Sequence, residues 1–395
     1  MQVVDTVEET WTLAVVEELM AGELPTDPSE MISAALHGVF GTWEASWVPS
    51  ASARDSLQWI FARIRDIHPD RSLLLPAFTC PVVLQSAKRA GAHVSFYDFA
   101  QPNGGFDLDS IAKALDPVRT SAIVITHLFG VPAALGPIPD LARERGILVI
   151  EDCAHAVEGH VDGNRVGTIG DATVVSFNYD KPISLGWGGA ALLRNRVLRD
   201  SLPRLNAPTA ESEVKELRRF ANFLKSRRNA IRPTVVRRVS NKLLRGSKRA
   251  SAAYQPPETG IGPLRAALAR WQLERLADTQ AARNRNAASI AGDLPPDVVW
   301  TVPSSSQPAW LKLKVGMPTK RVAQAVSRQL QLDGIRAGTF NWPTPIHADA
   351  PIAVETSQRF IDVPVHQNLA TAHTEVIKQR LTRALATATD QETAG

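Results

Sequence analysis

The stretch that decides the fold reads Ile147-Leu-Val-Ile-Glu-Asp152-Cys-Ala-His155, then Gly170-Asp-Ala-Thr-Val-Val-Ser176-Phe-Asn-Tyr-Asp-Lys181, and ends in Gly188-Gly189. Its first two segments each contain a short apolar run rich in β-branched residues and then turn polar. That pattern is typical of buried strands. An acid, a small hydroxyl and a lysine therefore follow strands that lie close together along the chain.

The residue types in this stretch fit pyridoxal phosphate. Of the side chains, only lysine supplies the primary amine that an aldehyde cofactor needs for a Schiff base, so Lys181 is the candidate catalytic residue. The pyridine ring works as an electron sink while its nitrogen stays protonated, which predicts a carboxylate such as Asp152 beside it. A phosphate dianion favours hydroxyls, backbone amides and a helix N-terminus. Ser176 and the segment Ser52-Ala53-Arg54 fit that need.

Each of these residues also has an ordinary structural interpretation. A lysine in a turn is ordinarily a solvated surface group, and an acid after a Val/Ile run often caps the next helix. Arg54 either pairs with a phosphate or is a solvated residue in the first turn of a surface helix. The ordered set of residues, rather than any single member, carries the inference.

These residues resemble the DegT/DnrJ/EryC1/StrS sugar aminotransferases, which are fold-type-I pyridoxal-phosphate enzymes. The segment from Glu151 to His155 is similar to the family's acid-bearing strand end, and Ser176-Phe177 with Lys181 to its lysine loop. The resemblance runs from about residue 45 to about residue 385. Further segments carry it: Leu75–Val83, Ala90–Asp98, Ala266–Leu276 and Val363–His366.

The resemblance adds two cofactor-binding candidates. Thr79 stands in the loop that lies over the cofactor in the family. His155 stands where a family residue faces the cofactor ring, and the alternative is a buried histidine with satisfied hydrogen bonds. Asp152, Ser176, Ser52, Ala53 and Arg54 complete the expected cofactor site.

Three positions depart from the family pattern. The stacking aromatic that usually follows the threonine is replaced by Cys80. In the family an asparagine before the small-domain helix reaches the partner subunit's cofactor phosphate, and here the segment Glu258-Thr-Gly260 stands in its place. The glutamate that usually precedes the glycine pair in the family is replaced by Trp187. The Trp187 ring either forms a wall of the substrate pocket or packs in the core.

Composition sets the general class of protein. With 395 residues, 44% hydrophobic and 21% charged, the chain is typical of a globular protein with one large and one smaller domain. The start of the chain lacks a signal-peptide pattern, and no apolar stretch is long enough to span a membrane. Cys80 and Cys153 form no disulfide framework, so we expect a cytoplasmic protein. His347 and His366 stand outside any Cys/His cluster, and we expect no metal.

Apolar β-rich runs alternate with helical patterns along the chain, which predicts an α/β fold with a mainly parallel sheet. A dinucleotide-binding Rossmann enzyme is disfavoured because no Gly-x-Gly-x-x-Gly turn follows an early strand. Ligands bind where strands end in such sheets. The expected strands are 72–75, 94–97, 122–126, 147–150, 173–177 and 190–193, and two expected helices are 107–115 and 139–145.

Residues 214–250 form a strongly basic segment. It holds thirteen Lys or Arg and one acid, Glu216, although the whole chain carries only +4. Apolar residues at helical spacing predict two amphipathic helices separated by Pro233. Three interpretations stay open: a solvated face packed on the large domain, a funnel for a nucleotide-diphosphate substrate, or a contact with anionic lipid. Nucleic-acid binding is not expected.

The expected organisation is a large cofactor-binding domain over residues 1–250, which includes the basic insertion 214–250. A linker over 251–262 and a small C-terminal α+β domain over 263–395 follow. The resemblance implies a homodimer with the active site near the subunit interface.

The resemblance implies transfer of an amino group from glutamate or glutamine to a keto sugar, in this family typically a nucleotide-linked one, in glycan or secondary-metabolite biosynthesis. A cyclitol ketone is an alternative acceptor. The alternative from another class is a catalytically silent relative that binds a partner in glycan assembly, which the departures at Cys80, Trp187 and Glu258 motivate.

Overall fold

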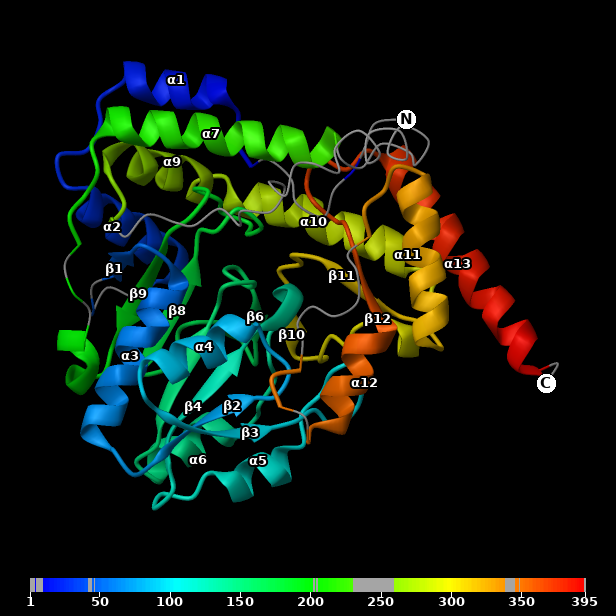
Figure 1. Cartoon of the computed structure of the whole chain (residues 1–395), viewed down its shortest axis with the longest axis horizontal. Helices are drawn as coiled ribbons and strands as arrows, with labels where there is room; N and C mark the ends of the chain where they lie inside the picture. The colour runs from blue at the N-terminus through cyan, green and yellow to red at the C-terminus, as the bar shows by residue number, and fades with distance from the viewer. Residues whose placement is uncertain are drawn as a thin grey trace, which may run out of the picture.

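The computed structural model describes residues 4, 10–41, 45, 47–201, 203, 205–229, 259–337, 345–347 and 349–393. Its centre is a seven-stranded sheet in the order β1-β9-β8-β5-β4-β2-β3 (Figure 1). Strands β3, β2, β4, β5 and β8 are parallel, whereas β9 is antiparallel to both β8 and β1. The expected α/β fold with a mainly parallel sheet is confirmed. The strands are β1 (Trp47–Ser50), β2 (Ser72–Pro76), β3 (His93–Tyr97), β4 (Thr120–Thr126), β5 (Leu148–Asp152), β8 (Ala172–Ser176) and β9 (Gly189–Leu193).

All six strands expected from the sequence form, as β2, β3, β4, β5, β8 and β9. The sequence did not predict β1, which has four residues and contains Pro49. Proline cannot donate a hydrogen bond to a neighbouring strand and is therefore confined to sheet edges. The position of β1 at one edge of the sheet agrees with this rule.

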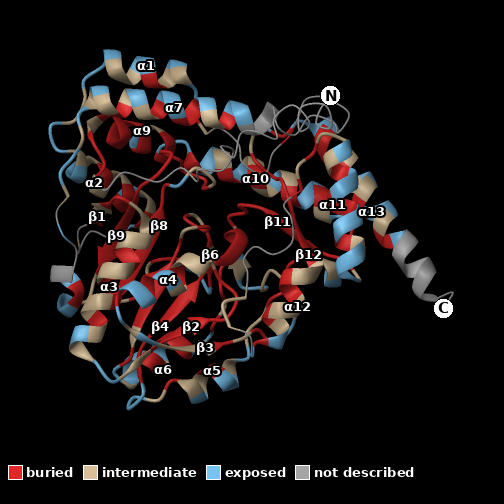
Figure 2. Cartoon of the chain, in the orientation of Figure 1, coloured by how far each residue is buried: buried red, intermediate tan, exposed pale blue. Residues whose placement is uncertain are grey.

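Helices cover both faces of the sheet. On one face, α3 (Ala53–Ile67) and α4 (Pro81–Arg89) share a core with β2, β4, β5, β8 and β9. On the other face, α5 (Leu108–Ala114) and α6 (Ile138–Glu144) pack on β4 and β5, which confirms the two expected helices. The strands are buried and the outer sides of the helices are exposed (Figure 2). Such three-layer packing leaves only strand ends open to ligands.

A second group of helices packs on the part of the sheet formed by β1, β9 and β8. It comprises α1 (Leu13–Ala21), α2 (Pro28–Phe40), α7 (Ala210–Asn229) and α9 (Pro263–Leu273), which share one core. In α7, Leu217, Phe220 and Leu224 are buried, whereas the basic Arg218 and Lys225 are exposed. The first helix of the basic segment is therefore amphipathic and packs on the large domain. Residues 230–258, including Pro233 and Glu258, lie outside the described residues.

The C-terminal part of the chain builds around a two-stranded sheet of β11 (Leu313–Gly316) and β12 (Phe360–Val363). Its core extends to Phe78 and Phe129 of the large sheet's loops, so the two parts pack directly on each other. The predicted domain division at residue 263 stays a prediction, although α9 packs with the large sheet. The helices here are α10 (Leu276–Ala291), α11 (Lys320–Leu332), α12 (Pro351–Arg359) and α13 (Thr371–Thr393).

Short elements complete the described structure: β6 (His160–Val161), β7 (Asn164–Arg165), β10 (Ser306–Gln307) and the 3-10 helices η1 (Leu128–Gly130), η2 (Arg196–Ser201) and η3 (Pro296–Val298). Strand β10 pairs with β6, which in turn pairs with β7. Across the described residues, no helix is both long enough and apolar enough to cross a bilayer.

The η1 segment fixes the C-terminal part against the large sheet. Ala309 N–H donates to Gly130 O at 2.7 Å, and Leu311 N–H donates to Phe129 O at 2.8 Å. Gly130 has φ +89°, and a Cβ placed on it would lie 2.0 Å from Ala309 O. Both the conformation and the close approach therefore require glycine here.

We predict that Gly130→Ala lowers the free energy of unfolding by more than about 2 kcal/mol, because the backbone of residues 309–311 must move away. Gly163→Ala is the matched control, since Gly163 has φ +77° but open space around it. The control should lose only about 1 kcal/mol. Equal losses for both variants, measured by urea unfolding, would contradict the proposed role of the close contact.

Candidate active site

The parallel strands all end on the same side of the sheet, so that their carboxyl ends form a row, and this row is called the sheet edge below. Asp152 ends β5 and Ser176 ends β8, and both are buried. Ser176 is paired with Gly189, where β9 begins, and Ser52 forms a bridge with Gly188. The structure therefore brings the acid, the hydroxyl, the glycine pair and the start of α3 to the same end of the strands, while their roles in binding a cofactor stay predictions.

The start of α3 forms a close-fitting cradle. Ser52 caps the helix, since its hydroxyl accepts from Asp55 N–H at 3.3 Å and donates to Asp55 Oδ2 at 2.7 Å. A Cβ on Gly189 would lie 2.5 Å from the Ala53 nitrogen, so only glycine allows this approach. Arg54 Nε is buried and has no hydrogen-bond partner among the described residues. A helix N-terminus, a hydroxyl and a guanidinium with unused donor capacity together suit a phosphate group.

Asp152 is 5% exposed, and its Oδ1 accepts a hydrogen bond from Ala154 N–H at 3.1 Å. Burial raises the pKa of Asp152, and the Ala154 N–H group and the charges of Lys181 and His127 reduce that increase only in part. A buried carboxylate of this kind favours a cationic or proton-bearing partner. It suits a protonated pyridine nitrogen.

Lys181 lies in the loop after β8 and is 8% exposed. Its Nζ is 3.4 Å from Asp180 Oδ2, while Asp180 Oδ1 is buried without a hydrogen-bond partner among the described residues. Burial raises the pKa of Asp180, but the charges of Lys181 and then Lys312 outweigh it and hold that pKa below its ordinary value. Asp180 is therefore an ionised counterion beside the candidate catalytic lysine.

His155 is buried, and its Nδ1 accepts a hydrogen bond from Phe129 N–H at 3.2 Å. Burial lowers the pKa of His155 well below its ordinary value, and the charges of Lys181, Lys312 and Lys314 add to this effect. The ring is therefore neutral, with its proton on Nε2. Its predicted contact with a cofactor ring stays a prediction.

Thr79 is fully buried, and its Oγ1 lies 3.3 Å from Thr126 Oγ1 at the end of β4. Cys80 follows as the N-cap residue, directly before α4 begins at Pro81. Burial raises the pKa of the Cys80 thiol, against the opposite effect of Lys181. Cys80 thus lies within electrostatic reach of the lysine, at the position where the family pattern places a ring.

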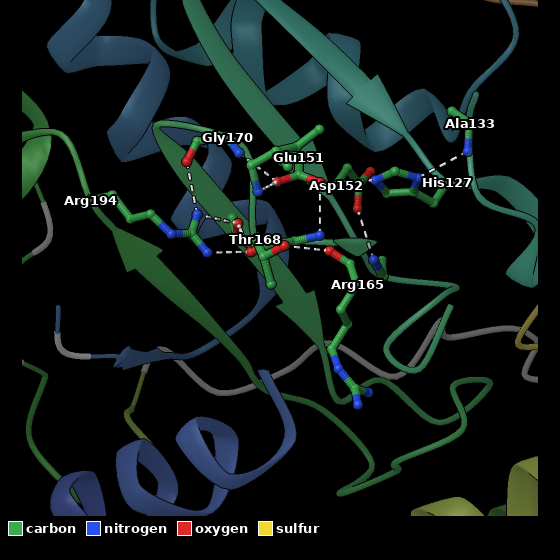
Figure 3. A network of polar contacts seen from close by, with 12 residues as sticks. His127, Ala133, Glu151, Asp152, Arg165, Thr168, Gly170 and Arg194 are labelled. Atoms are coloured by element: carbon green, nitrogen blue, oxygen red, sulfur yellow. Dashed lines mark hydrogen bonds and ion pairs between the residues drawn. The ribbon is translucent and has the colours of Figure 1, made fainter. Parts of the chain in front are cut away.

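Glu151 fixes the turn over residues 167–170, directly before β8, a role that the sequence did not indicate (Figure 3). Its carboxylate accepts hydrogen bonds from Gly167, Ile169 and Gly170 N–H groups at 2.7, 3.0 and 2.6 Å. His127 Nε2 lies 3.4 Å from the same carboxylate. Arg194 donates to the carbonyls of Gly167 and Gly170 from the other side of the turn.

Burial raises the pKa of Glu151, but the hydrogen bond and charge of His127 and the N–H groups of Gly170 and Gly167 outweigh it. The pKa therefore lies below the ordinary value, and the carboxylate is ionised at neutral pH. Glu151, His127 and Cys153 have their ligand atoms within 4.8 Å of one another. Three backbone N–H groups already donate to the Glu151 carboxylate. The role of this residue in holding the turn therefore explains why the three side chains lie together, without a metal ion.

Trp187 packs in the interior rather than standing at a surface. It is 2% exposed, and the Arg265 guanidinium lies 3.4 Å from its ring centroid. Arg265 also forms ion pairs with Glu213 at 3.1 Å and Glu216 at 2.9 Å. Glu213 in turn accepts from the N–H groups of Gly262, Leu264 and Arg265, so it caps the start of α9.

Lys312, Lys314 and Asp362 form a buried charged cluster that the sequence analysis did not find. Lys314 Nζ lies 2.7 Å from Asp362 Oδ1, and Lys312 Nζ lies 3.6 Å from Asp362 Oδ2. Apolar residues and lysines alternate in Leu311-Lys-Leu-Lys-Val315. Because alternate residues of a strand face the same side, this pattern could have indicated that Lys312 and Lys314 lie together. The lysines' partner, Asp362, is far away in sequence and could not be identified.

A family profile described as the DegT/DnrJ/EryC1/StrS aminotransferase family matches residues 48–382. A UDP-N-acetyl-3-dehydro-alpha-D-glucosamine 3-aminotransferase from Acidithiobacillus ferrooxidans is 32% identical over 43% of this chain and 46% of its own length. An L-glutamine:2-deoxy-scyllo-inosose aminotransferase from Streptomyces kanamyceticus is 30% identical over 41% of this chain and 38% of its own length. The aligned segments thus span less than half the length of these relatives.

Solved structures share the whole fold. The aminotransferase TlmJ from Streptoalloteichus hindustanus superposes with a TM-score of 0.71 at 22% identity, covering 98% of this chain and 99% of its own. Helicobacter pylori PseC, an aminotransferase involved in pseudoaminic acid biosynthesis, has a TM-score of 0.72 at 16% identity, covering 98% and 100%. The expected fold is confirmed over nearly the full chain.

We predict that Glu151→Gln lowers the free energy of unfolding at pH 7 by about 3 kcal/mol, because three N–H groups lose an ionised acceptor. Since the folded-state pKa lies below the ordinary 4.5, this stability is present above that pH and is lost as pH falls. The variant should therefore approach the wild type in acid.

Urea unfolding across a pH series measures this difference. Glu144→Gln is the matched control, because Glu144 is exposed. It should change stability by less than about 0.5 kcal/mol at any pH. A pH-independent loss in Glu151→Gln would contradict the role of the ionised carboxylate.

Proposed function

This chain belongs to the DegT/DnrJ/EryC1/StrS aminotransferase family, and we propose that it is a pyridoxal-phosphate-dependent aminotransferase. The observation that carries the proposal is the convergence of Asp152, Ser176 and the Lys181 loop at one sheet edge beside the start of α3. The catalytic residue is Lys181. The cofactor-binding residues are Asp152, His155, Ser176, Ser52, Ala53, Arg54 and Thr79.

When bound, pyridoxal phosphate supplies an aldehyde that bonds covalently to an amine and a ring that withdraws electrons from the neighbouring carbon. The α3 cradle, with Arg54 and Ser176, would hold its phosphate. Asp152 would keep a proton on the ring nitrogen. The neutral His155, held by Phe129 N–H, lies in the same site and carries no charge that would oppose the protonated ring.

Lys181 has two tasks in this proposal. Its Nζ would bond covalently to the cofactor between turnovers, and once freed the same amine would act as the base and acid that moves a proton during amino transfer. Asp180, 3.4 Å from Nζ, holds the amine in place. Because Asp180 is ionised, it also stabilises the lysine each time Nζ gains a proton.

We propose glutamate or glutamine as the amino donor and a keto sugar carried on a nucleotide as the acceptor. Relatives whose names specify UDP-, dTDP- and GDP-linked sugars support the acceptor class. The relative that uses glutamine and 2-deoxy-scyllo-inosose supports a cyclitol as the alternative. A catalytically silent binding protein is less well supported, because the departure at Trp187 is explained by its packing on Arg265.

We also propose that the chain forms a homodimer, as the family resemblance implies, and that it lies in the cytoplasm, as its two cysteines outside any disulfide framework suggest. Sedimentation should give the mass of two chains. An active monomer would contradict this proposal. The basic segment 214–250 is described only as far as α7, and its contact with substrate or lipid stays a prediction.

We predict that the purified protein loaded with pyridoxal phosphate converts glutamate or glutamine to the keto acid with formation of pyridoxamine phosphate. Lys181→Arg should lower this half-reaction by about 10³-fold, because arginine keeps the charge but cannot deliver the proton. Liquid chromatography of the quenched mixture measures both cofactor forms.

Lys113→Arg is the control, because Lys113 is exposed on α5. It should react like the wild type. A wild type that converts neither donor, or a Lys181→Arg variant of full activity, would contradict the proposed function.

A further inference from the structure

A groove is lined by α2 and by the junction of α9 with α10. Its volume is about 670 Å³, and none of the proposed cofactor-binding residues is among the described residues that line it. The lining residues from Asp27 to Val39 recur every three or four positions, and so do those from Arg270 to Ala277. Residues with this spacing lie on one face of a helix. The groove is therefore built from one face of α2 and one face of the α9–α10 junction.

The face of α2 that lines the groove is apolar, although it is not the face that packs into the core. Ile32, Leu36 and Phe40 are buried in the core that α2 shares with α9. Met31 is half-buried and Ala34 is exposed, and both line the groove. A surface helix ordinarily carries polar residues opposite its core face. Helix α2 thus presents a second apolar stripe to the groove.

Gly38 is the observation that points to a partner. It lies inside α2, where glycine is less favourable than alanine. A Cβ placed on Gly38 would meet no described atom within 4 Å, so packing within the described part of the chain does not require glycine here. Ala34 lies one turn earlier on the same face and also lines the groove. Small residues at this spacing allow a second helix to approach α2 closely.

The charges around the groove decide which kind of helix fits. Four acidic residues line it against two arginines, and both arginines are already paired with glutamates of the groove, at 2.8 and 3.4 Å. Asp27 and Glu30, at the start of α2, have no cationic partner in the part of the chain that the structure describes. This excess of negative charge favours a cationic partner. A second copy of the chain is disfavoured, because a two-fold contact places the same negative patch on both sides.

We propose that this groove is a docking site for a basic amphipathic helix of a partner protein. The apolar face of that helix would pack on Ala34 and Gly38, and its lysines or arginines would lie beside Asp27 and Glu30. An amphipathic helix that lays its apolar face into an apolar groove is a common mode of recognition. The lining face of α2 is about 18 Å long, which matches a partner helix of about 12 residues.

Two synthetic 14-residue peptides test the docking site by calorimetry. Both carry leucines at helical spacing on one face, and the other face carries lysines in one peptide and glutamates in its counterpart. We expect the lysine peptide to bind the wild type with a Kd of about 10 µM and the glutamate peptide to bind about tenfold more weakly or worse. Equal binding of the two peptides, or no binding of the lysine peptide, would overturn the proposal.

Gly38→Leu fills the groove where the partner helix approaches most closely, and it should weaken binding of the lysine peptide by about tenfold. Leucine favours a helix more than glycine does, so the variant should resist urea at least as well as the wild type, and lost binding would not come from lost folding. Ala325→Leu is the matched control, because Ala325 is exposed on α11 outside the groove. It should bind like the wild type, and so would Gly38→Leu if the groove were not the docking site.

Glu30→Lys tests the charge of the groove. It should weaken binding of the lysine peptide by about tenfold and strengthen binding of the glutamate peptide. Glu144→Lys makes the same change of charge at an exposed position on α6 and should alter neither. Effects of equal size in both variants would mean that the charge of the whole protein governs binding, which would contradict the proposed site.

Sedimentation of the wild type and of Gly38→Leu distinguishes a partner protein from a second copy of the chain. We expect the same mass for both, because the groove is not predicted to join two copies. A wild-type dimer that Gly38→Leu converts to a monomer would assign the groove to a second copy and overturn the proposal.

Discussion

The buried carboxylate of Glu151 is the interaction on which the site depends. Taking an ionised carboxylate out of water costs several kcal/mol. Three backbone N–H groups and His127 surround this one, and hydrogen bonds to a charged group contribute about 1.5–3 kcal/mol each. The hydrogen bonds together outweigh the cost of burial, so Glu151 stays ionised in the folded protein. The turn that it holds, residues 167–170, leads into β8, which ends in Ser176 and leads to Lys181, and Glu151 itself adjoins Asp152 at the end of β5.

The same physical principle operates where α7 meets α9. Glu213 is fully buried, accepts three N–H groups at the start of α9 and pairs with Arg265. Arg265 covers Trp187, which directly precedes the glycine pair at the sheet edge. The acidic residues of an otherwise basic helix thus anchor it against the loop that leads to Gly188 and Gly189. Substitution of the family's glutamate by Trp187 fits this local packing.

Much of the site could be predicted because its signals are local in sequence. Asp152, Ser176 and Lys181 each follow a recognisable buried strand, and parallel strands end at a common edge. The hydroxyl of Ser52 and the following residues were recognisable as the start of a helix. Strand β1 was missed because four residues with a proline give a weak pattern.

The remainder could not be predicted because it depends on contacts between distant segments. Glu151 adjoins the predicted Asp152, but its partners lie in the turn before β8, and sequence spacing does not show which backbone groups point inward. Lys314 and Asp362 meet only through the pairing of β11 with β12. Arg265 likewise meets Glu213 across 52 positions of sequence, and helical spacing alone does not show which distant side chain a helix will contact.

The most direct test of the account is to reduce the purified protein with borohydride in the presence of pyridoxal phosphate and map the labelled peptide. The account predicts a yellow protein that loses its colour on reduction and carries the label on Lys181 alone. A colourless protein that takes up no added cofactor, or a label on another lysine, would contradict it.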